Sequence, residues 1–343
     1  MPPPARPARF RPATRRPVTR PALRRPGLRC PGLRRGAAGG ALTAAAAAVS
    51  LLAAACTTSS ATSTASATTG TVVAVGAENE YANVIGQIGG RYVRVTAVES
   101  NPNTDPHSFE ASASVSQTVA AAELIVQNGL GYDSYMNTIE ASSPNSARKV
   151  IDVQHLLGKP DSTPNPHLWY SPATMPAVAR AVASDLSRLR PAHRAYFQAR
   201  LRAFDASLAP WQAAIAKFRA AYGGTTVATT EPVGDYLLQA LGLRNLTPFG
   251  LQADIMNGVD LSPQYVTLQD HLFQRHQVRV FVYNQQVVDA VTQAFLAQAR
   301  ESGIPVVGVY ETMPDGYNYQ SWMLAEVHAL ERAITAKVST EKL

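Results

Sequence analysis

Cysteine is almost absent from this sequence. Its 343 residues include only Cys30 and Cys56, and both lie within the first 56 positions. A domain folded from the residues after Cys56 therefore has no thiol of its own, which excludes internal disulfides and thiolate metal sites. Metal ligands in such a domain would have to be histidines or carboxylates.

Acidic residues are missing from the stretch between Met1 and Arg35, which contains eleven arginines and many prolines. A run of small and apolar residues follows and ends with three alanines directly before Cys56. A basic head, a short apolar run and small residues at its end are typical of an export signal. We expect residues 1–56 to be a lipoprotein signal peptide and Cys56 to be the lipidated residue. An uncleaved membrane anchor is the alternative, because the run approaches the length that spans a bilayer.

A basic surface for nucleic acid is also missing from the rest of the chain. The formal net charge of the whole sequence is +7, but the eleven arginines of the expected signal exceed that value and leave about −4 without them. No cluster of basic residues with interleaved aromatics follows Cys56, so we expect no nucleic-acid partner. Residues 57–70 are almost entirely serine, threonine and alanine, which predicts a flexible tether.

The remainder of the chain alternates short apolar runs with helical patterns. The strand-like runs are Thr71–Val75, Tyr92–Val98, Glu123–Gly129, Lys149–Val153, Thr225–Glu231, Val278–Asn284 and Pro305–Glu311. Helical spacing continues without a strand from Pro172 to Tyr222, and Pro210 should kink or split the second part of that region. Strands that alternate with helices predict an α/β fold with mainly parallel sheets.

We therefore expect two α/β lobes, each with a mainly parallel sheet, joined by one long helix. The sequence places an N-terminal lobe at 71–190, the linking helix at 191–222 and a C-terminal lobe at 223–343. The two halves show no sequence repeat, so their likeness is one of architecture only.

Four candidate ligands follow the strand-like runs. His107 comes after the second run and His167 after the fourth, whereas Glu231 and Glu311 end the first and last runs of the second half. Ligands of open α/β sheets bind beyond the carboxyl ends of the strands. If these ends face each other across a cleft, the four side chains converge. Two imidazoles and two carboxylates are a suitable ligand set for a divalent first-row metal.

Each candidate also has a simpler explanation. His107 and His167 could be ordinary loop residues, and Glu231 and Glu311 could cap the helices that follow them. The other histidines lie on helical patterns with polar neighbours, where exposed or partly buried side chains are expected; they are His155, His193, His271, His276 and His328. The matching positions of the four candidates relative to the strands favour the metal site.

Four motifs resemble those of a known family. The segments "DPHSFE", "NPHLWYSP", "TTEPVGDYLLQALGL" and "VVGVYETMPDGYNYQSWM" occur in this order, with the long helical region between the second and third. From about Thr71 to Val338 the chain resembles the metal-binding solute receptors of bacterial ABC transporters that import zinc and manganese. The resemblance implies one metal held between two lobes by His107, His167 and Glu231. The fourth ligand of the family is usually Asp, and this chain offers Glu311.

The resemblance also implies a function. Such a receptor captures one divalent metal, zinc or manganese, outside the cytoplasm and delivers it to an ABC transporter permease in the membrane. A lipid on Cys56 would hold it at the extracytoplasmic face of the cell membrane, and we expect it to be a monomer. We expect no enzymatic activity, because four protein ligands leave no position for an activated water and no His-Glu-x-x-His motif occurs.

The identity of the ligand stays open between several alternatives. Two carboxylates without sulfur favour manganese or iron, whereas the Irving–Williams order favours zinc at almost any site of nitrogen and oxygen ligands. A receptor for a chelated metal or a small organic ligand could use the same frame, with aromatic side chains in its cleft; the candidates are Trp169, Tyr170, Tyr310 and Trp322. Packing around the strand ends is the simpler role for these aromatics. A metal-binding surface adhesin is a further alternative.

Overall fold

The computed structural model describes residues 70–343. The expected signal peptide at 1–56, the expected lipidation site Cys56 and residues 57–69 of the expected tether lie outside the described residues. Among residues 70–343, no helix combines the length and the apolar character needed to cross a membrane.

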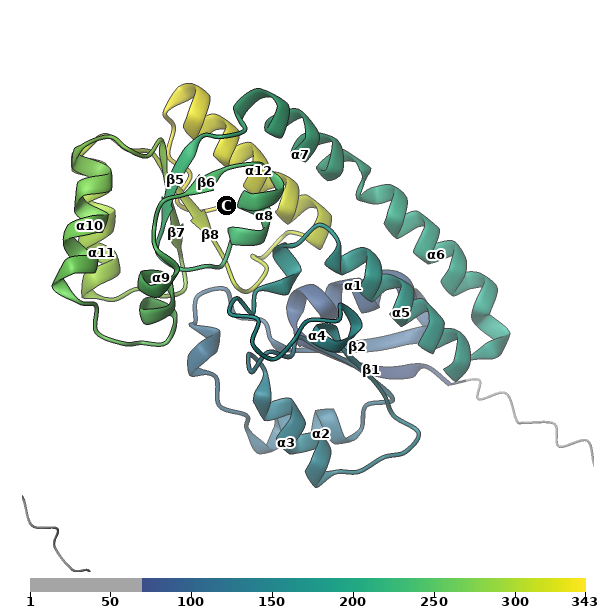
Figure 1. The fold of residues 1–343 in the computed structure, drawn as a ribbon. Coiled ribbons are helices and arrows are strands. Elements are labelled where there is room, and N and C mark those ends of the chain that lie inside the picture. The colour runs from purple at the N-terminus through teal and green to yellow at the C-terminus, as the bar shows by residue number, and fades with distance from the viewer. Residues whose placement is uncertain (1–69) are drawn as a thin grey trace, which may run out of the picture. The chain divides into compact units, whose positions relative to one another are not determined.

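The N-terminal lobe is built on a parallel four-stranded sheet with the strand order β2-β1-β3-β4 (Figure 1). Its strands are β1 (Val72–Glu78), β2 (Val93–Glu99), β3 (Leu124–Gln127) and β4 (Lys149–Asp152). Its helices are α1 (Asn79–Gly89), α2 (Ala113–Ala120), α3 (Ser134–Ser142), α4 (Val153–Leu156) and α5 (Thr174–Leu189), with short 3₁₀ turns η1 (Gly90–Tyr92), η2 (Pro106–Ser108), η3 (Leu168–Tyr170) and η4 (Pro191–His193). The central strands β1 and β3 are almost completely buried, as expected for apolar strands of a parallel sheet.

The C-terminal lobe repeats this topology with a second parallel sheet of the order β6-β5-β7-β8. Its strands are β5 (Thr226–Thr229), β6 (Arg244–Asn245), β7 (Val280–Asn284) and β8 (Val306–Val309). Its helices are α8 (Asp235–Ala240), α9 (Phe249–Met256), α10 (Pro263–Gln274), α11 (Ala290–Glu301) and α12 (Tyr319–Ala336). In both lobes the first strand of the lobe pairs with the second on one side and the third on the other.

Two helices connect the lobes, α6 (Arg194–Ser207) and α7 (Ala209–Tyr222), and they follow one another along one side of the molecule (Figure 1). Pro210, which the sequence predicts to kink or split this region, lies in the first turn of α7, and the helix breaks at Leu208. A proline is tolerated there because the N–H groups of the first helical turn have no intrahelical partner.

The strands are readable from the sequence, whereas several short elements are not. All seven strand-like runs become strands, and the α/β class with two mainly parallel lobes is confirmed. Strand β6 and the helices α3 and α9 were not expected. A strand of two residues has no readable alternation, and helices of eight or nine residues show little apolar periodicity.

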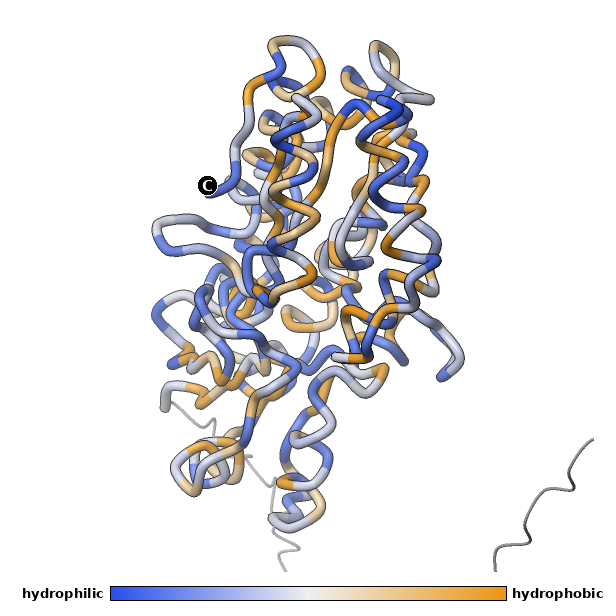
Figure 2. The backbone as a smooth tube through the Cα atoms, turned by 90° about the vertical axis from the view of Figure 1, so that its left-hand side faces the viewer, coloured by the Kyte–Doolittle hydropathy of each residue, from blue (hydrophilic) through white to orange (hydrophobic). Residues whose placement is uncertain are grey.

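One cluster of buried apolar side chains extends across both lobes. It contains Tyr81 and Trp169 from the N-terminal lobe, Trp211 from α7, and Val309 and Trp322 from the C-terminal lobe. Figure 2 shows hydrophobic and hydrophilic positions alternating along the helices, as burial of one helix face requires. The lobes are therefore fused through a continuous core on the side of α1, α5, α7 and α12.

Candidate metal centre

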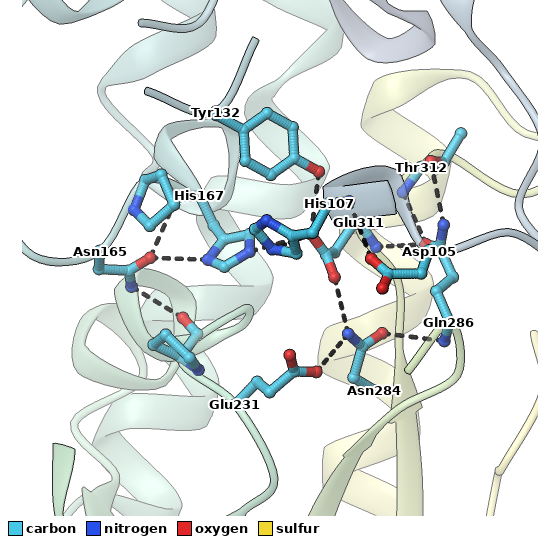
Figure 3. Close-up of polar contacts among 12 residues, drawn as sticks. Asp105, His107, Tyr132, Asn165, His167, Glu231, Asn284, Gln286, Glu311 and Thr312 are labelled. Atoms are coloured by element: carbon cyan, nitrogen blue, oxygen red, sulfur yellow. Dashed lines mark hydrogen bonds and ion pairs between the residues drawn. The ribbon is translucent and has the colours of Figure 1, made fainter. Parts of the chain in front are cut away.

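His107 lies in the loop that follows β2, on the short turn η2. The turn forms because Pro106 fixes its first residue and the Asp105 carboxylate accepts the His107 backbone N–H at 2.8 Å. The Asp-Pro-His sequence thus directs this imidazole toward the C-terminal lobe (Figure 3). Its side chain keeps 23% exposure, which makes it the accessible member of the site.

His167 lies between α4 and η3, and its side chain is completely buried. The Asn165 side-chain oxygen accepts both the backbone N–H and the ring Nδ1–H of His167, at 3.0 and 2.8 Å. The Asn165 amide group in turn donates to the backbone oxygen of Pro232 at 2.7 Å, which fixes the orientation of the amide. Because the proton of a neutral His167 is held on Nδ1, the lone pair of its Nε2 points into the site.

Glu311 is the central residue of the site. It follows β8 by two positions and is fully buried. Its Oε2 lies 3.2 Å from Nε2 of His107 and 3.2 Å from Nε2 of His167, and it accepts the hydroxyl of Tyr132 at 2.9 Å. The ligand atoms of the two histidines and Glu311 all lie within 4.8 Å of one another.

Glu231 follows β5 and lies beside this group without joining it (Figure 3). Its Oε2 accepts a hydrogen bond from Nδ2 of Asn284, and the same nitrogen donates to Oε1 of Glu311 at 2.7 Å. The residue is 2% exposed, and its Oε1 has no hydrogen-bond partner among residues 70–343. The structure therefore brings three of the four candidates together and links the fourth to them through Asn284.

The charges of the site follow from burial and mutual contact. Burial disfavours the imidazolium of His107, but the hydrogen bond and charge of Glu311 outweigh it and raise the pKa of His107 to about 9. Burial lowers the pKa of His167, so this imidazole is neutral at neutral pH. Although burial alone would raise it, the hydrogen bond and the charge of His107 hold the pKa of Glu311 well below its usual range. Burial and then the charge of Glu311 raise the pKa of Glu231.

Other carboxylates are buried in the N-terminal lobe at the ends of β1 and β2. Burial raises the pKa of Glu78 and of Glu80, and it raises the pKa of Glu99 to about 8. The carboxyl group of Glu99 is therefore largely protonated at neutral pH. Within the part of the chain that the structure describes, only His107, His167 and Glu311 form a group of three candidate ligands close enough to share an ion.

Three side chains near the strand ends also organise the site and are not among the residues predicted from the sequence. Asn284 and Gln286 stand at and just beyond the carboxyl end of β7, and Tyr132 follows β3. Like His107 and Glu311, they follow parallel strands, where ligands of open α/β sheets bind. These residue types do not indicate a metal site in a sequence, because an amide or a phenol is seldom a metal ligand.

The structure shows which of the simpler roles apply to the glutamates, the other histidines and the aromatic residues. Gly234 and Asn318 occupy the N-cap positions of α8 and α12, so neither glutamate caps the helix that follows it. The side chains of His155 and His328 are 76% and 53% exposed, as expected for surface histidines. The four aromatics considered for an organic ligand are buried and belong to the core; they are Trp169, Tyr170, Tyr310 and Trp322.

Comparisons with known proteins identify a family and two relatives. The family model for the periplasmic component A of the zinc-uptake complex (ZnuA) matches residues 75–333. A putative metal-binding protein of Treponema pallidum (strain Nichols) is 21% identical over 273 residues, which cover 74% of this chain and 84% of the relative. The manganese-binding lipoprotein MntA of Bacillus subtilis (strain 168) is 24% identical over 136 residues, which cover 38% of this chain and 44% of the relative.

Solved structures show the same fold. The periplasmic zinc-binding protein TroA from Treponema pallidum superimposes with a TM-score of 0.66 at 18% identity, covering 78% of this chain and all of TroA. A crystal structure of ZnuA superimposes with a TM-score of 0.63 at 20% identity, covering 77% of this chain and all of that one.

Proposed function

Because the chain belongs to the family of periplasmic zinc-uptake complex component A proteins, we propose that it is an extracytoplasmic receptor for one divalent transition metal, zinc or manganese. The metal binds between the lobes to His107, His167 and Glu311, and Glu231 completes the ligand set. The loaded receptor then delivers the metal to an ABC permease in the membrane.

The contact between His167 and Glu311 carries this proposal. The Nδ1 proton of His167 is held by Asn165, so its Nε2 presents a lone pair to the carboxylate oxygen of Glu311 at 3.2 Å. Two acceptors at this distance in a fully buried site repel each other unless a cation lies between them. The unpartnered Oε1 of Glu231 is a further buried oxygen that a cation would satisfy.

The ligand set excludes thiolate and iron–sulfur chemistry and is suitable for zinc or manganese. Two imidazole nitrogens and two carboxylates supply nitrogen and oxygen only, and residues 70–343 contain no cysteine. Zinc accepts four such ligands in a tetrahedral arrangement, whereas manganese suits the carboxylates and tolerates more oxygen ligands. Glu311 is one methylene longer than an aspartate, so its carboxylate reaches both histidines from the end of β8.

The proposed receptor role also implies a location of the protein outside the cytoplasm. The basic and apolar pattern of residues 1–56 supports export, and Cys56 supports a lipid anchor at the extracytoplasmic face of the cell membrane. A protein that delivers its metal rather than using it needs no open coordination position, and we propose that this protein has no enzymatic activity. We propose that it acts as a monomer with the permease as its partner.

Elemental analysis tests the proposal. The tag-free protein should contain about one zinc or manganese ion per chain. His107→Ala and Glu311→Ala should lose the metal, whereas His155→Ala, which removes an exposed histidine far from the group, should retain it. A metal-free protein that instead carries an organic molecule would contradict the proposal.

A further inference from the structure

The two lobes are joined very unequally on the two sides of the metal site. On the His167 side they share a continuous apolar core. Buried hydrogen bonds reinforce it: the Tyr170 hydroxyl donates to the backbone oxygen of Tyr310 at 2.8 Å, and the Tyr319 hydroxyl donates to that of Trp169 at 2.7 Å. Opening the lobes on this side would break both the packing and these hydrogen bonds.

The His107 side has almost none of these contacts. Within the segment 100–110, which carries His107, only Pro106 is buried. Apart from the contact of His107 with Glu311, one hydrogen bond among residues 70–343 joins this segment to the C-terminal lobe. In that bond, Nε2 of Gln286 donates to the backbone oxygen of Thr104 at 2.7 Å.

Gln286 is itself held against Glu311, the residue that contacts both histidines. Its Oε1 accepts the backbone N–H groups of Glu311 at 2.6 Å and of Thr312 at 2.8 Å, and its backbone N–H donates to Asn284. The residue is 6% exposed. One amide side chain therefore ties the backbone at Glu311 to the segment that carries His107 (Figure 3).

Open space lies on both sides of that segment. A cavity of about 300 Å³ is lined by residues of the segment, among them Phe109, and by Val98, Glu99 and Thr312. A second cavity of about 550 Å³ lies between His107 and Ser108 on one side and α9 and the residues after β7 on the other. Displacement of the segment would therefore meet little packed structure, unlike displacement of His167.

From this asymmetry we infer that the metal leaves by movement of the segment 100–110 alone, and that Gln286 is the positioning residue that holds this segment closed. The inference rests on the proposed function and adds to it the site of release. His167, Glu311 and the fused core stay in place, while His107 withdraws with its loop and opens the coordination shell.

The test compares two identical substitutions. Gln286→Met removes the hydrogen bond to Thr104 together with those that Gln286 Oε1 accepts from Glu311 and Thr312. Gln87→Met removes two other hydrogen bonds between the lobes, which Gln87 and Gln320 donate to each other at 2.9 and 2.8 Å. Amide hydrogen exchange of the metal-free proteins is measured at Thr104, His107, Ser108 and Phe109, with β3 and β7 as internal references. Metal dissociation is measured in parallel by stopped-flow with excess chelator.

Gln286→Met should accelerate both the exchange of the segment and the dissociation of the metal roughly tenfold, because the one hydrogen bond of Gln286 that holds the segment is lost. Gln87→Met should leave both rates unchanged, and β3 and β7 should stay protected in both variants. Unchanged exchange of the segment in Gln286→Met, or equal acceleration throughout both lobes, would overturn the inference. Because exchange is measured without metal, this outcome is independent of whether the wild-type protein binds metal.

Discussion

The Nε2 atom of His167 lies 3.2 Å from Oε2 of Glu311, and both side chains are completely buried. The two residues are 144 positions apart and come from different lobes. With the ring proton held on Nδ1 by Asn165, this contact places two acceptors against each other. The carboxylate of Glu311 therefore lies at the centre of this group of side chains.

Glu311→Gln should separate metal binding from folding. The substitution removes the negative charge but keeps the shape, and the new amide N–H can donate to the Nε2 lone pair of His167. We expect metal affinity to fall by more than the roughly 10–100-fold loss that is typical when a residue hydrogen-bonded to a metal ligand is replaced. The thermal midpoint of the metal-free protein should change little. Chelator competition and thermal unfolding measure the two effects, and an unchanged affinity would remove Glu311 from the ligand set.

Asn284→Ala should weaken metal binding although Asn284 offers no ligand atom to the metal. Its Nδ2 donates hydrogen bonds to the carboxylates of both Glu231 and Glu311. Without this shared donor, the two buried carboxylates would face each other directly. We expect a loss of roughly 10–100-fold in affinity by chelator competition. The exposed Asn145→Ala is the matched control and should bind as the wild type does. Equal affinities of the two variants would show that the carboxylates need no such support.

Metal binding should release protons. In the metal-free protein His107 has a pKa raised to about 9, so it is protonated at pH 7.5, whereas metal binds the neutral imidazole. Affinity should therefore rise by roughly tenfold per pH unit as the pH increases toward that pKa. Calorimetry in buffers of different ionisation enthalpy should show about one proton released per metal at pH 7.5, or more if Glu231 also loses one. A binding enthalpy independent of the buffer would contradict the assigned charge of His107.

Glu326→Gln should stabilise the protein in alkali but not in acid. Burial raises the pKa of Glu326 to about 8, although Trp322 and Tyr170 donate to its carboxylate. A carboxyl whose pKa is higher in the folded state contributes stability below its unfolded pKa and loses it as the pH rises through the folded value. Urea unfolding should therefore give similar stabilities for variant and wild type near pH 4.5, and a more stable variant at pH 8.5. A constant difference at both pH values would show that Glu326 titrates normally.

The positions of the candidate ligands are predictable because functional residues of parallel sheets lie beyond the carboxyl ends of the strands. His107, His167, Glu231 and Glu311 all follow strands, and the strands are readable from their apolar runs. The distinction between Glu231 and Glu311 was not predictable. It depends on the pairing of Asn284 with Val309 across β7 and β8, which sets the amide between the two carboxylates.

The burial of charged groups was equally hidden in the sequence. Nothing in the pattern around Glu78, Glu80 and Glu326 distinguishes them from surface residues, because burial depends on which helices pack over the strand ends. The roles of Gln286 and Asn165 also depend on contacts between distant segments, with Thr104 and with Pro232.

Anomalous diffraction from crystals grown with zinc or manganese tests the central claim most directly. We expect one strong anomalous peak per chain, about 2.0–2.2 Å from Nε2 of His107, Nε2 of His167 and a carboxylate oxygen of Glu311. The peak should also lie within reach of Oε1 of Glu231, the oxygen that has no partner among the described residues. A metal bound elsewhere on the protein, or no peak between the two histidines at saturating metal, would contradict the account.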